Sequence, residues 1–298
     1  MNRVRRSGDA AGDRWPFAGR RSIHVVAILL VTAGALQAGG FSESTVWDDG
    51  FSEMCFYDAT DTIYGTPRQY TRVHLMNRQW MDPLTGVKTD AETPGAIHAF
   101  KLVIAEQIPT ENYNYRYLTT VFLRRSDLTP LKMTTSSQEW CGHTFKILRW
   151  AEGRLDVRSF SYFPGEGDRT FERPRDAVPF ESLFIIAREA AATLRPQALE
   201  VLPSMRSNRQ VVPDAAAATV VPSPETQRVA TPLGPLDVRR VRVESAQTTA
   251  WFDVEAAAPH RIVAFEAGDE SGQLVAMERR AYWDRRWASS VYPQGSAP

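Results

Sequence analysis

The stretch LKMTTSSQEWCGHTFKILRW, Leu131–Trp150, decides the fold. Branched, aromatic and polar side chains alternate along it, which is typical of β-strands because successive side chains of a strand point to opposite faces. Read as one strand, the stretch places Glu139, Cys141 and His143 on the same face. A buried face would then carry an acid, a thiol and an imidazole, so candidate chemistry is expected here first.

Strands of similar pattern are predicted on both sides of this stretch. In chain order they are residues 54–59, 96–108, 115–125, 131–137, 143–150, 155–163, 210–212, 227–230, 236–244, 248–255, 261–267 and 273–282. Short turn signals such as DESG, Asp269–Gly272, predict antiparallel pairing. Residues 64–94 are irregular, and we expect short strands or loops there. The predicted fold is mainly β, an antiparallel curved sheet or open β-barrel, since closure hides sheet edges.

One amphipathic helix is predicted for residues 179–194. Apolar residues from Phe180 to Leu194 recur at three- and four-residue steps, and Pro196 interrupts the run. We expect this helix to pack across the sheet as part of the core. A gate or a partner-binding helix is the alternative.

The amino end has the composition of an export segment. The first 38 residues contain six arginines and two aspartates, and the apolar run VVAILLVTAGAL fills residues 25–36. This pattern predicts a secretory signal peptide, with a retained N-terminal anchor as the alternative. The protein is therefore expected to be periplasmic or extracellular, with membrane proximity through residues 1–38.

The remaining chain is expected to form a single antiparallel β domain at residues 54–288. A flexible lead-in at 39–53 would precede it, an irregular loop would occupy 203–224, and residues 289–298 would be a frayed tail. The 298 residues have a formal net charge of zero, and removing residues 1–38 leaves 29 basic and 33 acidic residues, a net charge of −4. A weakly acidic domain without a basic patch argues against nucleic-acid binding.

The two cysteines allow three interpretations. Cys55 and Cys141 are an even pair in an expected oxidising compartment, so a disulfide between them is one, and two separate buried thiols are another. The third is a thiol enzyme, with Cys141 as nucleophile, His143 as base and Glu139 as orienting group. The same trio falls short of the usual metal-ligand spacings, so neither a metal nor a cofactor is expected. The structural alternative is a satisfied polar pair of Glu139 and His143 inside the barrel or at its rim.

Aromatic residues suggest a binding surface. Tyr115, Tyr117, Trp140 and Trp251 are candidates to line a groove for a lipid or a glycan, because their rings combine apolar faces with polar edges. Ordinary core and rim packing is the alternative for each of them.

Several motifs carry a resemblance to known proteins. VPFESLFIIAR at Val178–Arg188, TPLGPLDVRRVRV at Thr231–Val243 and PHRIVAFE at Pro259–Glu266 resemble a family of exported bacterial proteins of unknown function. The resemblance covers roughly residues 55–285 and implies a curved antiparallel β architecture related in shape to carriers of apolar ligands. SSQEWCGHTF at Ser136–Phe145 looks like a motif of exported proteins that sometimes carry a septum-formation-inhibitor label. That label is not transferred, because the true inhibitors are cytoplasmic α/β nucleotide pyrophosphatases.

The sequence as a whole predicts an exported cell-envelope protein that acts as a non-catalytic binding or carrier module for an apolar or amphipathic ligand. A thiol-dependent hydrolase or thiol-exchange enzyme is one alternative. A structural envelope protein with protein partners alone is the other.

Overall fold

A computed structural model describes residues 40–151, 153–174, 176–210, 214–247 and 249–284 of the chain. These residues all belong to one compact unit, Ala33–Pro298. The predicted signal segment, residues 1–38, and the predicted frayed tail, residues 289–298, lie outside the described residues. Within the described part, no helix has the length and apolar character that crossing a bilayer requires.

The described residues form seventeen strands, one α-helix and two short 3-10 helices. The first nine strands are β1 (Ser52–Ile63), β2 (Thr66–Asp82), β3 (Val87–Thr89), β4 (Ile97–Ile108), β5 (Tyr115–Arg124), β6 (Pro130–Glu139), β7 (Gly142–Ala151), β8 (Arg154–Phe160) and β9 (Arg169–Pro174). The others are β10 (Ala177–Pro179), β11 (Gln197–Leu202), β12 (Ala216–Pro222), β13 (Gln227–Val229), β14 (Leu236–Ser245), β15 (Thr249–Glu255), β16 (Ile262–Ala267) and β17 (Glu270–Arg280). The helices are η1 (Thr45–Asp48), η2 (Phe180–Ser182) and α1 (Leu183–Thr193).

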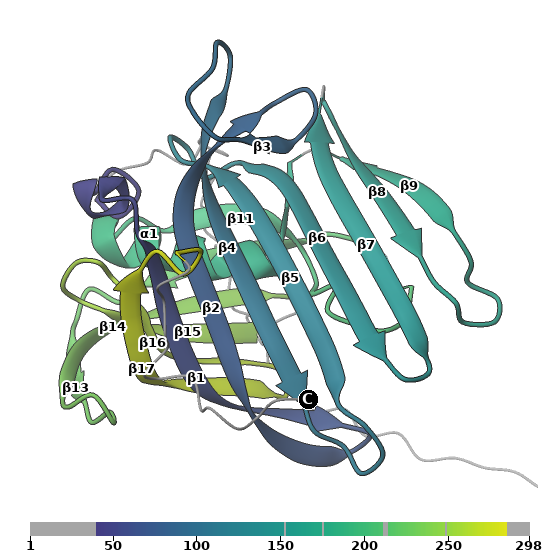
Figure 1. The fold of residues 1–298 in the computed structure, drawn as a ribbon. Helices are drawn as coiled ribbons and strands as arrows, with labels where there is room; N and C mark the ends of the chain where they lie inside the picture. Colours follow the sequence, from purple (N-terminus) through teal and green to yellow (C-terminus); the bar gives the residue numbers. More distant parts are fainter. Residues whose placement is uncertain (1–39, 152, 175, 211–213, 248, 285–298) are drawn as a thin grey trace, which may run out of the picture. The chain divides into compact units, whose positions relative to one another are not determined.

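The strands pair into one long curved sheet. It runs from β9 through β8, β7, β6, β5, β4, β2, β1, β17, β16, β15, β14, β12 and β11 to β10. Nearly all these pairs are antiparallel, and β10 with β11 is parallel. The pairing of β1 with β17 joins the first half of the chain to the second. Figure 1 shows β1–β9 as one face, with β17 beside β1 and with β11, β15 and β16 behind. The predicted mainly-β, barrel-like fold with one packed helix is confirmed.

Helix α1 fills the upper interior of the curved sheet. It packs against β12, β14 and β15, and the Phe184 ring contacts the rings of Phe252 and Phe265 at centroid distances of 5.1 Å. Phe100 and Leu148, from the opposite face, belong to the same buried cluster. The apolar stripe expected at 179–194 is therefore core, which agrees with the expectation that the helix packs across the sheet.

The expected flexible lead-in at 39–53 is wrong for its described part. Phe41 and Trp47 are each 1% exposed, and the Trp47 ring packs edge-on against Phe41 and Phe100. The Ser42 amide donates to Glu189 on α1. Small polar residues made this segment look like a linker, but two buried aromatic rings fix it to the core.

Two further expectations need correction. Residues 64–94, expected to be irregular, contain the 17-residue strand β2. The irregular loop expected at 203–224 contains β12, and the strand expected at 210–212 extends into residues outside the described part. Polar residues that face the interior, such as Arg72 and His74, disrupt the apolar alternation that would have predicted β2.

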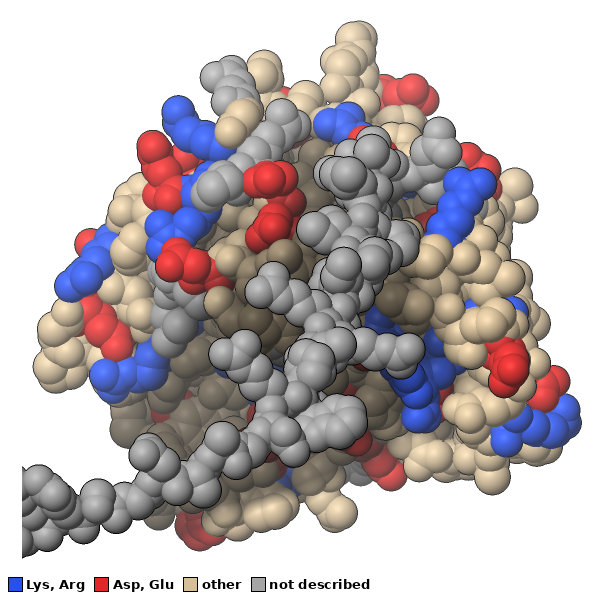
Figure 2. Space-filling model, turned by 180° about the vertical axis from the view of Figure 1, so that it is seen from behind, with Lys and Arg blue, Asp and Glu red and all other residues tan. Residues whose placement is uncertain are grey.

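Around the margin of the view in Figure 2, basic and acidic side chains are interspersed.

Candidate functional site

One end of the sheet gathers the hairpin turns that carry exposed or half-buried aromatic side chains. The β1–β2 turn carries Tyr64, the β4–β5 loop carries Tyr113, the β6–β7 turn carries Trp140, and the β8–β9 loop carries Tyr162. Antiparallel pairing places these four connections at the same end of their strands. Tyr64 and Trp140 are 82% and 85% exposed, which is unusual for rings of this size.

The rings form a row that leads from the surface inward. Trp140 stacks on Tyr113 at a centroid distance of 5.8 Å. Tyr113 lies 5.6 Å from Tyr115, and Tyr115 stacks on Tyr117 at 6.2 Å. Trp140 is exposed while Tyr115 and Tyr117 are buried. We call these four residues the aromatic row. Three of them, Tyr115, Tyr117 and Trp140, are sequence candidates that the structure brings together.

The fourth aromatic candidate, Trp251, lies elsewhere. It is on β15, and the Arg240 guanidinium sits 4.2 Å from the centre of its ring. Its neighbour Phe252 points into the core, so Trp251 lies on the opposite face of that strand. The structure gives it a cation–π partner rather than a place in the aromatic row.

The acid, thiol and imidazole of the β6–β7 hairpin do not share a face. Trp140 and Cys141 form a two-residue turn, with Glu139 paired to Gly142 and Gln138 paired to His143. The turn reverses the alternation, so His143 is exposed while Glu139 faces inward and accepts a hydrogen bond from Asn208 at 2.7 Å. The arrangement of nucleophile, base and orienting group expected from a single continuous strand is therefore not formed.

The cysteines are separate. Both are free thiols, with Cys55 buried in β1 and Cys141 exposed in the turn. The disulfide considered for this pair is not formed, because Cys55 is enclosed within β1 whereas Cys141 is at the exposed tip of the β6–β7 hairpin. Cys141 Sγ lies 2.9 Å from the Tyr113 hydroxyl, and this contact raises the pKa of Tyr113 to about 12. Next to it, Gly142 is required because a Cβ there would meet the Tyr162 ring at 2.4 Å.

A segment that we call the strap, residues 203–210, crosses the interior beneath the aromatic row. Lys146 on β7 donates to the carbonyls of Met205 and Ser207, at 3.1 and 2.8 Å. Thr144 donates to the carbonyl of Asn208 at 2.6 Å. The strap is thereby tied to β7, and through the Asn208 side chain to the last residue of β6.

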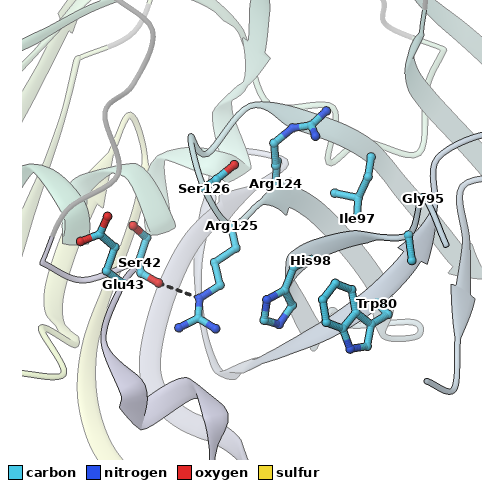
Figure 3. Close-up of a pocket in the computed structure, with 10 residues that line it drawn as sticks. Ser42, Glu43, Trp80, Gly95, Ile97, His98, Arg124, Arg125 and Ser126 are labelled. Atoms are coloured by element: carbon cyan, nitrogen blue, oxygen red, sulfur yellow. Dashed lines mark hydrogen bonds between the residues drawn. The ribbon is translucent and has the colours of Figure 1, made fainter. Parts of the chain in front are cut away.

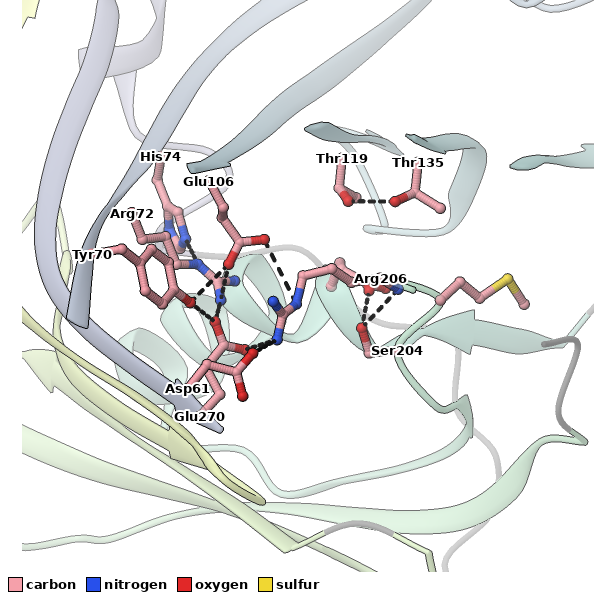
Figure 4. Close-up of polar contacts among 12 residues, drawn as sticks. Asp61, Tyr70, Arg72, His74, Glu106, Thr119, Thr135, Ser204, Arg206 and Glu270 are labelled. Carbon is pink, nitrogen blue, oxygen red and sulfur yellow. Dashed lines mark hydrogen bonds and ion pairs between the residues drawn. The ribbon is translucent and has the colours of Figure 1, made fainter. Parts of the chain in front are cut away.

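Below the strap lies a buried network of charged side chains, which Figure 4 shows converging from several strands. Arg206 of the strap pairs with Asp61 at 2.5 Å and lies 3.7 Å from Glu106. Arg72 pairs with Glu270 and hydrogen bonds His74 at 2.9 Å. Buried charges of this kind are tolerated when each is paired.

Burial and neighbouring charges shift the pKa values of several side chains in and around this network. Burial raises the pKa of Tyr117 to about 12, opposed in part by the Arg206 guanidinium over its ring. Burial lowers the pKa of Lys146 to about 8. Burial, together with Arg72, lowers the pKa of His74 well below its ordinary value. These groups are structural, because each faces partners within the chain.

The interior therefore differs from the apolar lumen that the carrier hypothesis implies. Its upper part is filled by α1, and its lower part by the strap and the charged network. A cleft of about 320 Å³ opens beside this network, lined by Asp61, Arg206, Glu270 and neighbouring residues. Asp61 and Glu270 in its wall already pair with Arg206 and Arg72. Among the described residues, no group of three or more His, Cys, Asp or Glu is placed to hold a metal ion.

Comparisons with known proteins add little about activity. A scan against protein-family models finds no match, and a search of curated proteins finds none either. A crystal structure of a β-barrel-like protein of domain of unknown function DUF1849 from Brucella abortus covers 77% of this chain and 98% of that chain. The identity is 10% and the TM-score is 0.48. A likeness of this size carries no argument, and function has to be argued from the residues themselves.

Sequence reasoning missed the strap and the charged network. Asp61, Arg72, Glu106, Arg206 and Glu270 come from four strands and a loop that are far apart in the chain. Each looks like an ordinary surface charge when read alone. The one available signal was the series of polar and aromatic side chains at every second position inside β2, namely Arg68, Tyr70, Arg72 and His74, which share one face of the strand.

Proposed function

We propose that this domain is an exported, non-catalytic binding module of the cell envelope, and that its aromatic row binds a glycan. The main observation behind this proposal is that Trp140, which is 85% exposed, stacks on Tyr113 at the outer end of the row of four rings. Exposed rings of this size at the tips of hairpins add nothing to the core, which favours a role in contact with another molecule.

The polar groups along the row favour a carbohydrate over a lipid. The hydroxyls of Tyr64 and Tyr115 meet one another, and Glu139 and Asn208 form a hydrogen-bonded pair beside the turn. A sugar ring has apolar faces that suit aromatic rings and hydroxyl groups at its edge that suit carboxylates and amides. An acyl chain would displace water from these polar groups and offer them no hydrogen bond in return, which costs free energy.

The test is a titration of the purified domain, residues 39–298, with soluble oligosaccharides of three kinds: neutral glucose oligomers, N-acetylglucosamine oligomers and oligomers that contain uronic acids. Intrinsic tryptophan fluorescence and calorimetry report binding. We expect saturable binding of at least one class, with no enrichment on phosphatidylglycerol vesicles. Binding to vesicles without binding to any oligosaccharide would show a lipid surface instead, and binding to neither would overturn the proposal.

A further inference from the structure

Glu139 is a carboxylate without a cationic partner beside the aromatic row. The register of β5 and β6 pairs Tyr117 with Ser137, and it leads on to Tyr115 and Glu139 as neighbours on the same inward face. Glu139 Oε1 accepts a hydrogen bond from Asn208 at 2.7 Å. In the part of the chain that the structure describes, Oε2 accepts no hydrogen bond and no Lys, Arg or His pairs with the carboxylate. A half-buried position therefore holds an unpaired negative charge.

Aromatic rings lie on both sides of this carboxylate. Tyr115 is its neighbour on β5, and Gly142 is its paired residue on β7. The Tyr162 ring fills the place that a side chain at Gly142 would take, because a Cβ there would clash with that ring. Burial raises the pKa of Tyr115 and of Tyr162, and the negative charge of Glu139 raises both further. A carboxylate flanked by rings attracts cations, since ring faces also carry negative charge.

The arginines of the strap do not neutralise this charge, because each has another partner. Arg206 pairs with Asp61 at 2.5 Å, and Arg209 pairs with Glu166 at 2.7 Å. Both arginines therefore hold other carboxylates. The negative charge of Glu139 is left for a ligand.

Another cleft of the domain shows the opposite case, a charged side chain that the fold itself uses. This cleft has a volume of about 680 Å³, and Arg125 is in its lining (Figure 3). Arg125 donates to the carbonyl of Ser42 at 2.8 Å and to Asp48 at 2.7 Å. Its guanidinium is thus engaged within the chain, whereas the carboxylate of Glu139 has one neutral donor, Asn208.

We propose that the glycan of the aromatic row is built of amino sugars, and that one ammonium group lies at Glu139, between Tyr115 and Tyr162. This inference rests on the proposed function, because it names the class of glycan for the same row. An ammonium group donates charge-assisted hydrogen bonds to a carboxylate and is attracted to aromatic rings. An acidic sugar would instead bring a second negative charge close to Glu139, which costs free energy.

The test is calorimetric titration of the protein with the tetramers of glucosamine and of N-acetylglucosamine, in mildly acidic buffer where the amino groups are protonated. The two tetramers share ring and linkage, and they differ in an ammonium group against an acetamide group. The glucosamine tetramer should bind roughly tenfold more tightly, as expected for one charge-assisted hydrogen bond. Added salt should reduce this difference, because it screens the attraction between the charges.

Glu139→Gln tests the residue itself. The amide oxygen can still accept from Asn208 while the negative charge is lost. The two tetramers should then bind equally to within about twofold, and the affinity for the N-acetylglucosamine tetramer should stay unchanged. That retained binding also shows that the variant is folded. Glu244→Gln, which alters an exposed carboxylate on β14, should keep the full difference between the tetramers.

The possible failures separate this inference from the proposed function. Equal affinities of the two tetramers for the unaltered protein, or binding of glucose or uronic-acid oligomers alone, would overturn the inference and leave a glycan site in place. A difference that persists in Glu139→Gln would contradict the role of this carboxylate. An equal loss of affinity for both tetramers in that variant would contradict it too, since Glu139 would then hold sugar hydroxyls. Absence of binding by every oligosaccharide would overturn the proposed function as well.

Discussion

Arg72 Nε donates to His74 Nε2 across 2.9 Å, between two side chains that follow one another on the same face of β2. Because guanidinium nitrogens cannot accept, the imidazole must present an unprotonated Nε2. The His74 ring also lies against Tyr57 and Phe184, at centroid distances of 4.8 Å. A neutral histidine is thus built into the centre of the fold.

The first prediction is a loss of stability in mild acid. In the unfolded chain His74 takes up a proton as the pH falls below its ordinary pKa of 6.5, whereas the folded ring takes one up well below that value. Unfolding then binds a proton, so the stability present above pH 6.5 is lost as the pH falls, by up to about 1.4 kcal/mol per pH unit. Urea denaturation between pH 7.5 and 5 measures this slope. The free energy of unfolding of His74→Gln should decline less steeply as the pH falls. Parallel curves for the two proteins would contradict the assignment of this pH dependence to His74.

The second prediction concerns the strap. Arg206→Met removes the cation that approaches Asp61, Glu106 and Glu270, at 2.5, 3.7 and 3.8 Å. Removing one partner of a buried ion pair costs about 3–5 kcal/mol, because the remaining charge stays buried. Chemical denaturation at pH 7.5 should show a loss of this size.

The matched control for the strap is Arg228→Met. Arg228 pairs with Asp237 on the surface, where the two side chains are 63% and 57% exposed. An exposed pair contributes about 0–1 kcal/mol. If Arg206→Met were no more destabilising than this control, the strap would not depend on the charged network.

The third prediction concerns the cysteines. In the folded protein, iodoacetamide should modify Cys141, which is exposed, and leave Cys55, which is buried. Burial raises the pKa of Cys55 far above its ordinary value, and a protonated thiol is a poor nucleophile. Mass spectrometry of the native protein should find one modification, and a second after unfolding in guanidinium. A protein that shows no modification until it is reduced would contain the disulfide that the structure lacks.

Local patterns in the sequence were enough for much of the fold. The three- and four-residue steps from Phe180 to Leu194 predicted α1, because its apolar face packs in a core. Alternation in residues 115–125 and 143–150 predicted β5 and β7, where buried and partly exposed residues alternate along the strand. Pattern failed at β2, because Arg72 and His74 face inward to partners that lie far away in the sequence.

The candidate site was less predictable for a geometric reason. Whether Glu139 and His143 share a face of the sheet depends on the two residues Trp140 and Cys141. They either continue one strand or form the turn of a hairpin. Across a two-residue turn Glu139 pairs with Gly142 and His143 with Gln138, so the side chains of Glu139 and His143 lie on opposite faces. Tyr115 and Trp140 were recognisable as aromatic candidates, but their connection through Tyr113 depends on neighbouring hairpins coming together at one end of the sheet.

The most direct test of the binding proposal compares two tryptophan variants. Trp140→Ala removes the exposed head of the aromatic row, whereas Trp251→Ala removes a ring that lies over Arg240 on a different strand. Calorimetry uses the oligosaccharide that binds the unaltered protein best. Trp140→Ala should weaken its binding roughly tenfold, in line with the stacking contribution of one ring, while Trp251→Ala should leave the affinity unchanged. Equal affinities in both variants and the unaltered protein would contradict the account.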